Sequence, residues 1–139
     1  MKNSILLVIT VLFTLFSFGQ NGSAPSNVRN KFNSKYANAQ DLKWSQKEGN
    51  YEATFETDNL KKIVLLDSKG TVLKSESQMY IATLPVKILN FFKEKQPESE
   101  TTGAKKIIDE KQIVTYVVTS TFNNEKNVFN EKGDFVKNE

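Results

Sequence analysis

The sequence predicts an α+β fold: two tandem repeats, each with one helix and a four-stranded antiparallel meander, and a sheet covered by helices on one face. Three observations support this. Two short segments have helical periodicity, the segments after each alternate apolar and polar residues, and Gly, Asn and Asp residues separate those segments. The same order occurs in residues 20–80 and 81–139, and the two repeats are expected to share one curved sheet.

The first helix is predicted just after residue 25. Pro25 suits the first turn of a helix, where its missing N–H has no partner to lose. Val28, Phe32 and Tyr36 then recur at intervals of four residues, which gives one narrow apolar stripe. A short amphipathic helix follows from this pattern, and its stripe must be buried on the sheet.

Four strands are predicted after this helix, over residues 42–47, 51–56, 61–66 and 71–78. Gly49 can take the positive φ that a tight hairpin between the first two requires. Asp67 and Gly70 are typical of the first and fourth places of a β-turn. Residues 63–66 are apolar without alternation, which predicts a strand covered on both faces.

The second repeat is predicted to begin at residue 81. Thr83 as the cap, then Leu84, and Pro85 in the first turn open a second helix. Its apolar face consists of Val86, Leu89 and Phe92, together with Ile88. Residues 98–103 are polar and are predicted to form a loop. Further strands are predicted over residues 104–108, 113–122, 126–130 and 134–136.

The first nineteen residues have the layout of a secretory signal peptide. Lys2 precedes an apolar run at residues 5–18, and the small residues Ser17 and Gly19 indicate cleavage before Gln20. The run is shorter than the roughly 20 residues that a membrane-spanning helix needs. We therefore expect an exported protein, periplasmic or extracellular, with no membrane association after cleavage.

Composition excludes several kinds of chemistry. The chain has no cysteine and no histidine, so thiol nucleophiles, disulfides, the commonest general base and the commonest transition-metal ligand are absent. A formal net charge of +3 is too small to indicate nucleic-acid binding. Asp67 is the single carboxylate of its turn, fewer than a calcium loop supplies. No enzyme activity, cofactor or metal is predicted.

The positions that define the core and turns carry a resemblance to a known family. They are Phe32, Tyr36, Ala39, Lys43, Trp44, Gly49, Tyr51, Glu52, Ala53, Phe55, Asp67 and Gly70 in the first repeat, and Leu84, Pro85, Lys132, Gly133, Asp134 and Phe135 in the second. The chain resembles the PepSY-like, or β-lactamase-inhibitor-like, family of small exported bacterial proteins. This resemblance implies tandem helix-plus-sheet repeats and binding or inhibition of other proteins, including peptidases. A β-lactamase target is not implied, because the chain lacks that inhibitor's cysteines.

We therefore predict a non-catalytic binding module for another exported protein or peptide, with inhibition of a protein or peptidase as its narrower form. It would act through the exposed sheet face and the hairpin tips, since a broad polar sheet surface suits protein recognition better than a closed pocket. The alternative is a carrier of a small apolar ligand between helices and sheet, suggested by the ten phenylalanines and the apolar run 63–66. The oligomeric state is left open. The predicted binding residues are Glu52, Thr54, Glu56, Lys74, Glu76 and Tyr80.

Overall fold

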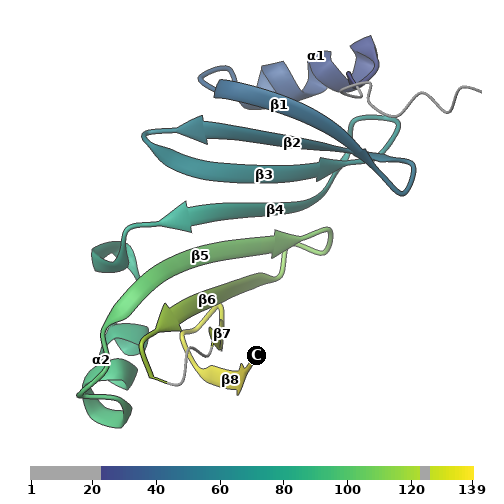
Figure 1. Ribbon diagram of the computed structural model, residues 1–139. Coiled ribbons are helices and arrows are strands. Elements are labelled where there is room, and N and C mark those ends of the chain that lie inside the picture. Colours follow the sequence, from purple (N-terminus) through teal and green to yellow (C-terminus); the bar gives the residue numbers. More distant parts are fainter. Residues whose placement is uncertain (1–22, 123–125) are drawn as a thin grey trace, which may run out of the picture.

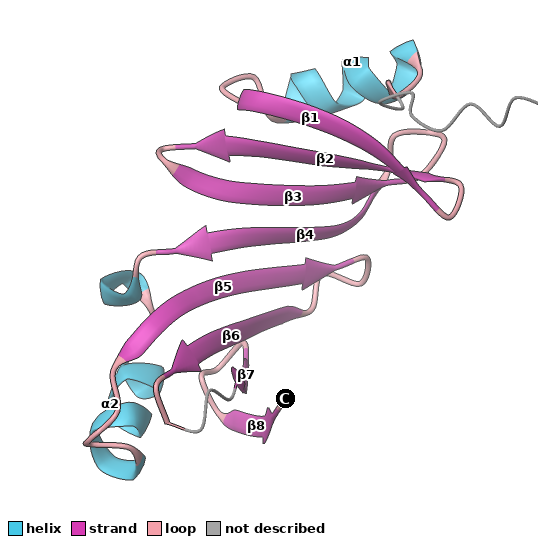
Figure 2. Cartoon of the chain, viewed as in Figure 1, coloured by secondary structure: helices cyan, strands magenta, loops and turns pink. Residues whose placement is uncertain are grey.

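The computed structural model describes residues 23–122 and 126–139, and its main feature is one eight-stranded antiparallel sheet (Figure 1). The strands lie in the sheet in chain order, so each pairs with its neighbours in sequence. Figure 2 shows how short the helices are beside this sheet. The elements are α1 (Ser26–Lys35), β1 (Gln40–Lys47), β2 (Asn50–Thr57), β3 (Leu60–Leu66), β4 (Val72–Met79), η1 (Ile81–Thr83), α2 (Val86–Lys95), β5 (Thr101–Asp109), β6 (Val114–Ser120), β7 (Lys126–Asn130) and β8 (Phe135–Asn138).

The predicted α+β fold of two tandem repeats is wrong. The described chain is mostly sheet, and α1 and α2 have only ten residues each. β4 pairs with β5 from Lys74 opposite Asp109 to Met79 opposite Ala104, so the sheet continues without a break across residue 80. β7 and β8 have five and four residues, whereas β3 and β4 have seven and eight. The expected shared sheet is present, and the pairing of β4 with β5 satisfies backbone groups that two open edges would leave unpaired.

The predicted signal peptide, residues 1–19, lies outside the described residues. In the part of the chain that is described, none of the helices has the length and apolar character needed to cross a membrane.

Helix α1 buries its apolar stripe against β2 and β3. Val28 and Phe32 are fully buried, and they pack on Ala53, Phe55, Val64 and Leu66. The Phe32 ring lies 5.0 Å from the Phe55 ring and 5.1 Å from the Trp44 ring, both edge-on, which is the geometry that aromatic pairs prefer. Phe32 is therefore the centre of the core under α1.

Helix α2 covers the other end of the sheet (Figure 1). Ile88 and Phe92 pack on Ala104, Val118 and Phe129. On the flank of the helix, the Phe91 ring stacks on the Phe135 ring of β8 at 5.0 Å. The core under α2 therefore reaches the last strand of the sheet.

Strand register places both helices on the same face. Side chains of directly paired residues point to the same face. Val64, which packs under α1, pairs with Ser75, Ser75 pairs with Ile108, and Ile108 pairs with Val114. Four residues along the same two strands, Ala104 and Val118 pack under α2. The opposite face is covered by neither helix.

A buried polar cluster lies beneath the C-terminal end of α2. The Gln96 side chain donates to Asn127 Oδ1 at 3.1 Å, and the Ser120 hydroxyl donates to Gln96 Oε1 at 3.0 Å. Asn127 is fully buried, so a lost partner here would leave a buried amide unsatisfied. Gln96, Ser120 and Asn127 are the buried polar residues of the described chain, and none of them lies under α1. This is a second difference between the two ends of the sheet.

Three turns are stabilised by the same pattern of side-chain-to-backbone hydrogen bonds. A side-chain oxygen at the end of a strand accepts hydrogen bonds from the backbone N–H groups two and four residues later. The bonds run from Lys69 and Thr71 to Asp67, from Lys111 and Ile113 to Asp109, and from Lys132 and Asp134 to Asn130. The bond from Thr71 is the main cause that lowers the pKa of Asp67. These bonds fix the registers of β3–β4, β5–β6 and β7–β8.

Replacing Phe32 with alanine should destabilise the protein by about 3–5 kcal/mol, because it leaves a cavity where three aromatic rings meet. Urea denaturation followed by circular dichroism measures the loss, and Trp44 fluorescence reports on the same core. Val86→Ala is the control, since this α2 side chain is 71% exposed, and it should change stability by less than about 0.5 kcal/mol. Equal midpoints for the two variants would contradict this account of the core.

Candidate functional site

The candidate site is the sheet face opposite the helices, which we call the open face. Alternation along each strand and pairing between strands determine which side chains lie on it. Its centre runs over β2 to β7 and includes Glu52, Thr54, Glu56, Lys61, Ile63, Leu65, Lys74, Glu76, Gln78, Gly103, Lys105, Ile107, Thr115, Val117, Thr119 and Lys126.

Four of the predicted binding residues come together on this face. Glu52 and Thr54 lie on β2, and Lys74 and Glu76 lie on β4. β3 separates the two pairs, because Glu52 pairs with Leu65 and Leu65 with Lys74. A cavity of about 70 Å³ lies between them, lined by Lys47, Glu52, Ile63, Leu65, Lys74 and Glu76. Its volume is far below the roughly 300–1,000 Å³ of small-molecule pockets, so it is a shallow depression in the surface.

The other two predicted binding residues, Glu56 and Tyr80, lie near the β2–β3 turn. Glu56 is exposed and pairs with Lys61 close to the β2–β3 turn. Tyr80 follows β4, is 55% exposed, and its hydroxyl donates to the carbonyl oxygen of Asp58 in that turn at 3.4 Å. Both therefore belong to the β2–β3 hairpin tip and its surroundings.

Glu76 is the electrostatic centre of the open face. Its carboxylate lies 2.6 Å from Lys74 Nζ and 2.9 Å from Lys105 Nζ, and its side chain is 23% exposed. Burial raises the pKa of Glu76, but the hydrogen bonds and positive charges of Lys74 and Lys105 outweigh it and hold the pKa below its ordinary value. This carboxylate is therefore ionised and held in place by two ammonium groups.

The open face also has apolar members that the sequence prediction assigned elsewhere. Ile63 and Leu65 are half-buried and project from β3 away from the helices, so β3 is covered on one face only and the expectation of two covered faces is wrong. Ile107 on β5 is half-buried beside Glu76, and Val117 on β6 is buried. The sequence could have predicted these positions, because a sheet covered by helices on one face leaves every second residue of an apolar strand on the uncovered face.

Charged side chains at the centre of the open face form ion pairs around Glu76. Across residues 23–122 and 126–139, no group of three or more acidic side chains gathers where an ion could be held. Glu76 is engaged by two lysines, an arrangement that holds a charge in place.

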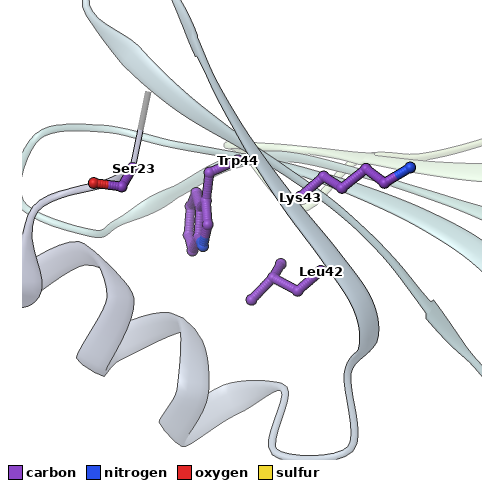
Figure 3. A pocket seen from close by; sticks show the side chains of 4 residues that line it. All are labelled: Ser23, Leu42, Lys43 and Trp44. Atoms are coloured by element: carbon purple, nitrogen blue, oxygen red, sulfur yellow. The ribbon is translucent and has the colours of Figure 1, made fainter. Parts of the chain in front are cut away.

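A larger cavity lies on the opposite face, at the edge of the sheet. It measures about 500 Å³, and Ser23, Leu42, Lys43 and Trp44 line it. Figure 3 shows that Leu42 and Trp44 point from β1 toward α1, while Lys43 points the other way. Trp44 is half-buried and packs on Phe32, as a member of the core under α1. The size and place of this cavity are relevant to the alternative prediction, a carrier of a small apolar ligand between helices and sheet.

No protein-family model matches the chain, and no curated protein matches it significantly. Solved structures share the fold of its described residues, a single sheet of eight strands with two α-helices, and one of them is a BLIP-like protein. The BLIP-like protein from Bacteroides fragilis is 24% identical, with a TM-score of 0.70 over 84% of this chain and 86% of that one.

Two further solved structures share this fold. A candidate periplasmic protein from Bacteroides eggerthii is 16% identical, with a TM-score of 0.74 over 85% of this chain and 89% of that one. A DUF2874 family protein from Bacteroides uniformis is 17% identical, with a TM-score of 0.73 over 84% and 89%. At these identities the likeness concerns the fold. It fits the β-lactamase-inhibitor-like part of the expected resemblance, and the PepSY part is not shown.

Stability at low pH should depend on Glu76. Because its pKa is lower in the folded protein than in the unfolded chain, Glu76 stabilises the fold above its ordinary pKa, near 4.5, and this contribution is lost as pH falls through the folded value. We expect Glu76→Gln to cost about 0.5–1 kcal/mol at pH 7, the range of partly exposed ion pairs, and progressively less below pH 4.5.

Urea denaturation at pH 7, 5, 4 and 3 tests this expectation. Glu98→Gln, in the exposed loop after α2, is the matched control and should leave the pH profile unchanged. A constant difference between Glu76→Gln and the wild type at all four pH values would show that Glu76 has no such role.

Proposed function

We propose that this chain is an exported, non-catalytic binding module that recognises another exported protein through its open face. The observation that carries the proposal is the one-sided cover of the sheet. Both helices pack on one face, and the other retains half-buried apolar side chains among charged ones. Such a mixed surface is typical of protein recognition, where an apolar centre is bordered by polar groups.

Two further points support the proposal. The leader at residues 1–19 has the layout of a signal peptide, and a structure of the same fold is that of a candidate periplasmic protein. Another belongs to a BLIP-like protein, which makes inhibition of a protein or peptidase the narrower form of the proposal. The hairpin tip with Glu56 and Tyr80 would extend the contact beyond the sheet face.

Capture from a cell-envelope extract tests the docking face. The wild type, Glu52→Lys/Glu56→Lys and Glu94→Lys/Glu98→Lys are immobilised, and bound proteins are quantified by mass spectrometry. The first variant reverses two charges on the open face, whereas the second makes the same charge change on and after α2. We expect a specific partner that the first variant captures at least tenfold less, and the second as well as the wild type. Equal capture by both variants would exclude the open face.

The carrier of a small apolar ligand is the second candidate, and one observation favours it. The cavity beside Leu42 and Trp44, at about 500 Å³, lies in the range of small-molecule pockets. Deeper space between α1 and the sheet is filled, since Phe32 and Phe55 are buried in mutual contact. Native mass spectrometry of protein purified from its host distinguishes the candidates. The binding module should have the mass of the polypeptide alone, and a co-purified small molecule would favour the carrier.

A further inference from the structure

Gly103 lies within β5, where neither its backbone nor its packing requires glycine. The other described glycines, Gly49, Gly70 and Gly133, have φ near +80°, a conformation that other residues rarely adopt. Gly103 does not have a positive φ, and a Cβ added there would have no atom within 4 Å. The predicted loop at residues 98–103 is thus partly strand, because β5 begins at Thr101.

The strand irregularity at this position does not explain the glycine. Thr101 pairs with Ser120 and Gly103 with Thr119, so β5 bulges between residues 101 and 103. Glycine is needed in the type of bulge that has a left-handed residue, and Gly103 is not left-handed. Glycine inside a strand also occurs where another molecule approaches the sheet closely. The missing side chain leaves space on the open face.

That space is a small cavity, which we call the Gly103 notch. Two rows of cross-strand neighbours form it, because Gln78 pairs with Lys105 and Lys105 with Val117, while Gly103 pairs with Thr119 and Thr119 with Lys126. Its volume is about 180 Å³, too small for a typical ligand pocket and of a size for one side chain. The described lining residues are Gln78, Gly103, Ala104, Lys105, Val117, Thr119 and Lys126.

The notch is positively charged. Lys105 and Lys126 line it, and none of its described lining residues is acidic. Glu76, outside the notch, is shared by Lys105 and Lys74, so one carboxylate faces two ammonium groups. Glu139 also lies outside, and Lys137 first, then Lys126 and Lys105, lower its pKa. The Thr119 hydroxyl and the Gln78 amide add hydrogen-bond donors, and Val117 adds an apolar wall.

We propose that the Gly103 notch receives an acidic side chain of the partner protein, a glutamate or aspartate on an extended segment that lies across the open face. This inference rests on the proposed function and names the chemistry of the partner. The carboxylate would meet Lys105, Lys126 and the Thr119 hydroxyl, and its methylene groups would pack on Val117. A side chain at residue 103 would occupy the same space, which accounts for the glycine.

Peptide titration followed by ¹H–¹⁵N NMR tests the inference. The probes are acetylated and amidated Ala-Val-Glu-Val-Ala and the same peptide with glutamine in place of glutamate. We expect the glutamate peptide to shift the amide signals of Gly103, Thr119 and Lys126 saturably, and to bind at least fivefold tighter than the glutamine peptide. The difference should shrink in high salt, since it depends on charge.

Variants locate the site. Gly103→Thr should fill the notch without strain and raise the Kd of the glutamate peptide at least fivefold, because the backbone at residue 103 suits any residue and the new Cβ meets no atom. Lys126→Gln should have a similar effect. Lys61→Gln removes the same charge from β3 on the same face and should leave the Kd unchanged. Circular dichroism and thermal unfolding confirm that each variant is folded.

Several results would overturn the inference: equal Kd values for the two peptides, no saturable shift with either, or an unchanged Kd for folded Gly103→Thr. Any of these leaves the proposed function intact if Glu52→Lys/Glu56→Lys still loses partner capture. If capture does not depend on the open face, the proposed function fails together with the role of the notch in it, whatever the peptides show.

Discussion

Unbroken pairing of strands in chain order is the constraint on which the rest of the structure depends. Directly paired residues on neighbouring strands point to the same face of the sheet. Val64 lies under α1, and its successive partners Ser75, Ile108 and Val114 therefore point to that same face. Both helices therefore share a face although residues 36–85 separate them in sequence. A shift of one residue between β4 and β5 would turn Ala104 and Val118 away from α2.

The two faces are consequently stabilised in different ways. The helix-covered face is held by apolar burial, with Phe32 and Phe129 fully buried at opposite ends of the sheet. Neither helix covers the open face, and its apolar side chains are bordered by charged ones. The ion pair of Glu76 with Lys105 joins β4 to β5, and Lys74 pairs with Glu76 within β4. Because such pairs contribute little stability, the proposed docking of a partner would cost the open face little in lost contacts.

Local structure was predictable because neighbouring residues determine it. The stripe of Val28 and Phe32, the hairpin at Gly49 and the turn at Asp67 occur where the sequence places them. One shared sheet was expected, but the register of β4 on β5 was not coded locally, since α2 intervenes between them. The division into two equal repeats was wrong, because β7 and β8 are shorter than β3 and β4 and the described chain is one sheet. The apolar members of the open face were missed because alternation separates two faces without saying which one is covered. Gly103 was assigned to a loop because its polar neighbours conceal a strand.

In many larger folds helices cover both faces of a sheet, whereas here they cover one. The side chains of the open face therefore determine what kind of molecule can pack on it. Along the centre of the open face, Leu65, Ile63, Ile107 and Val117 give a discontinuous apolar path from β3 to β6. Charges lie on either side of this path, and the Gly103 notch lies at its β6 end. An extended segment that carries apolar residues and one acidic residue on the same side, two or four residues apart, matches both features, because its apolar residues would cover the path while the carboxylate enters the notch. In the proposed function, the apolar and charged residues of the uncovered face would therefore also determine which partner segment binds there.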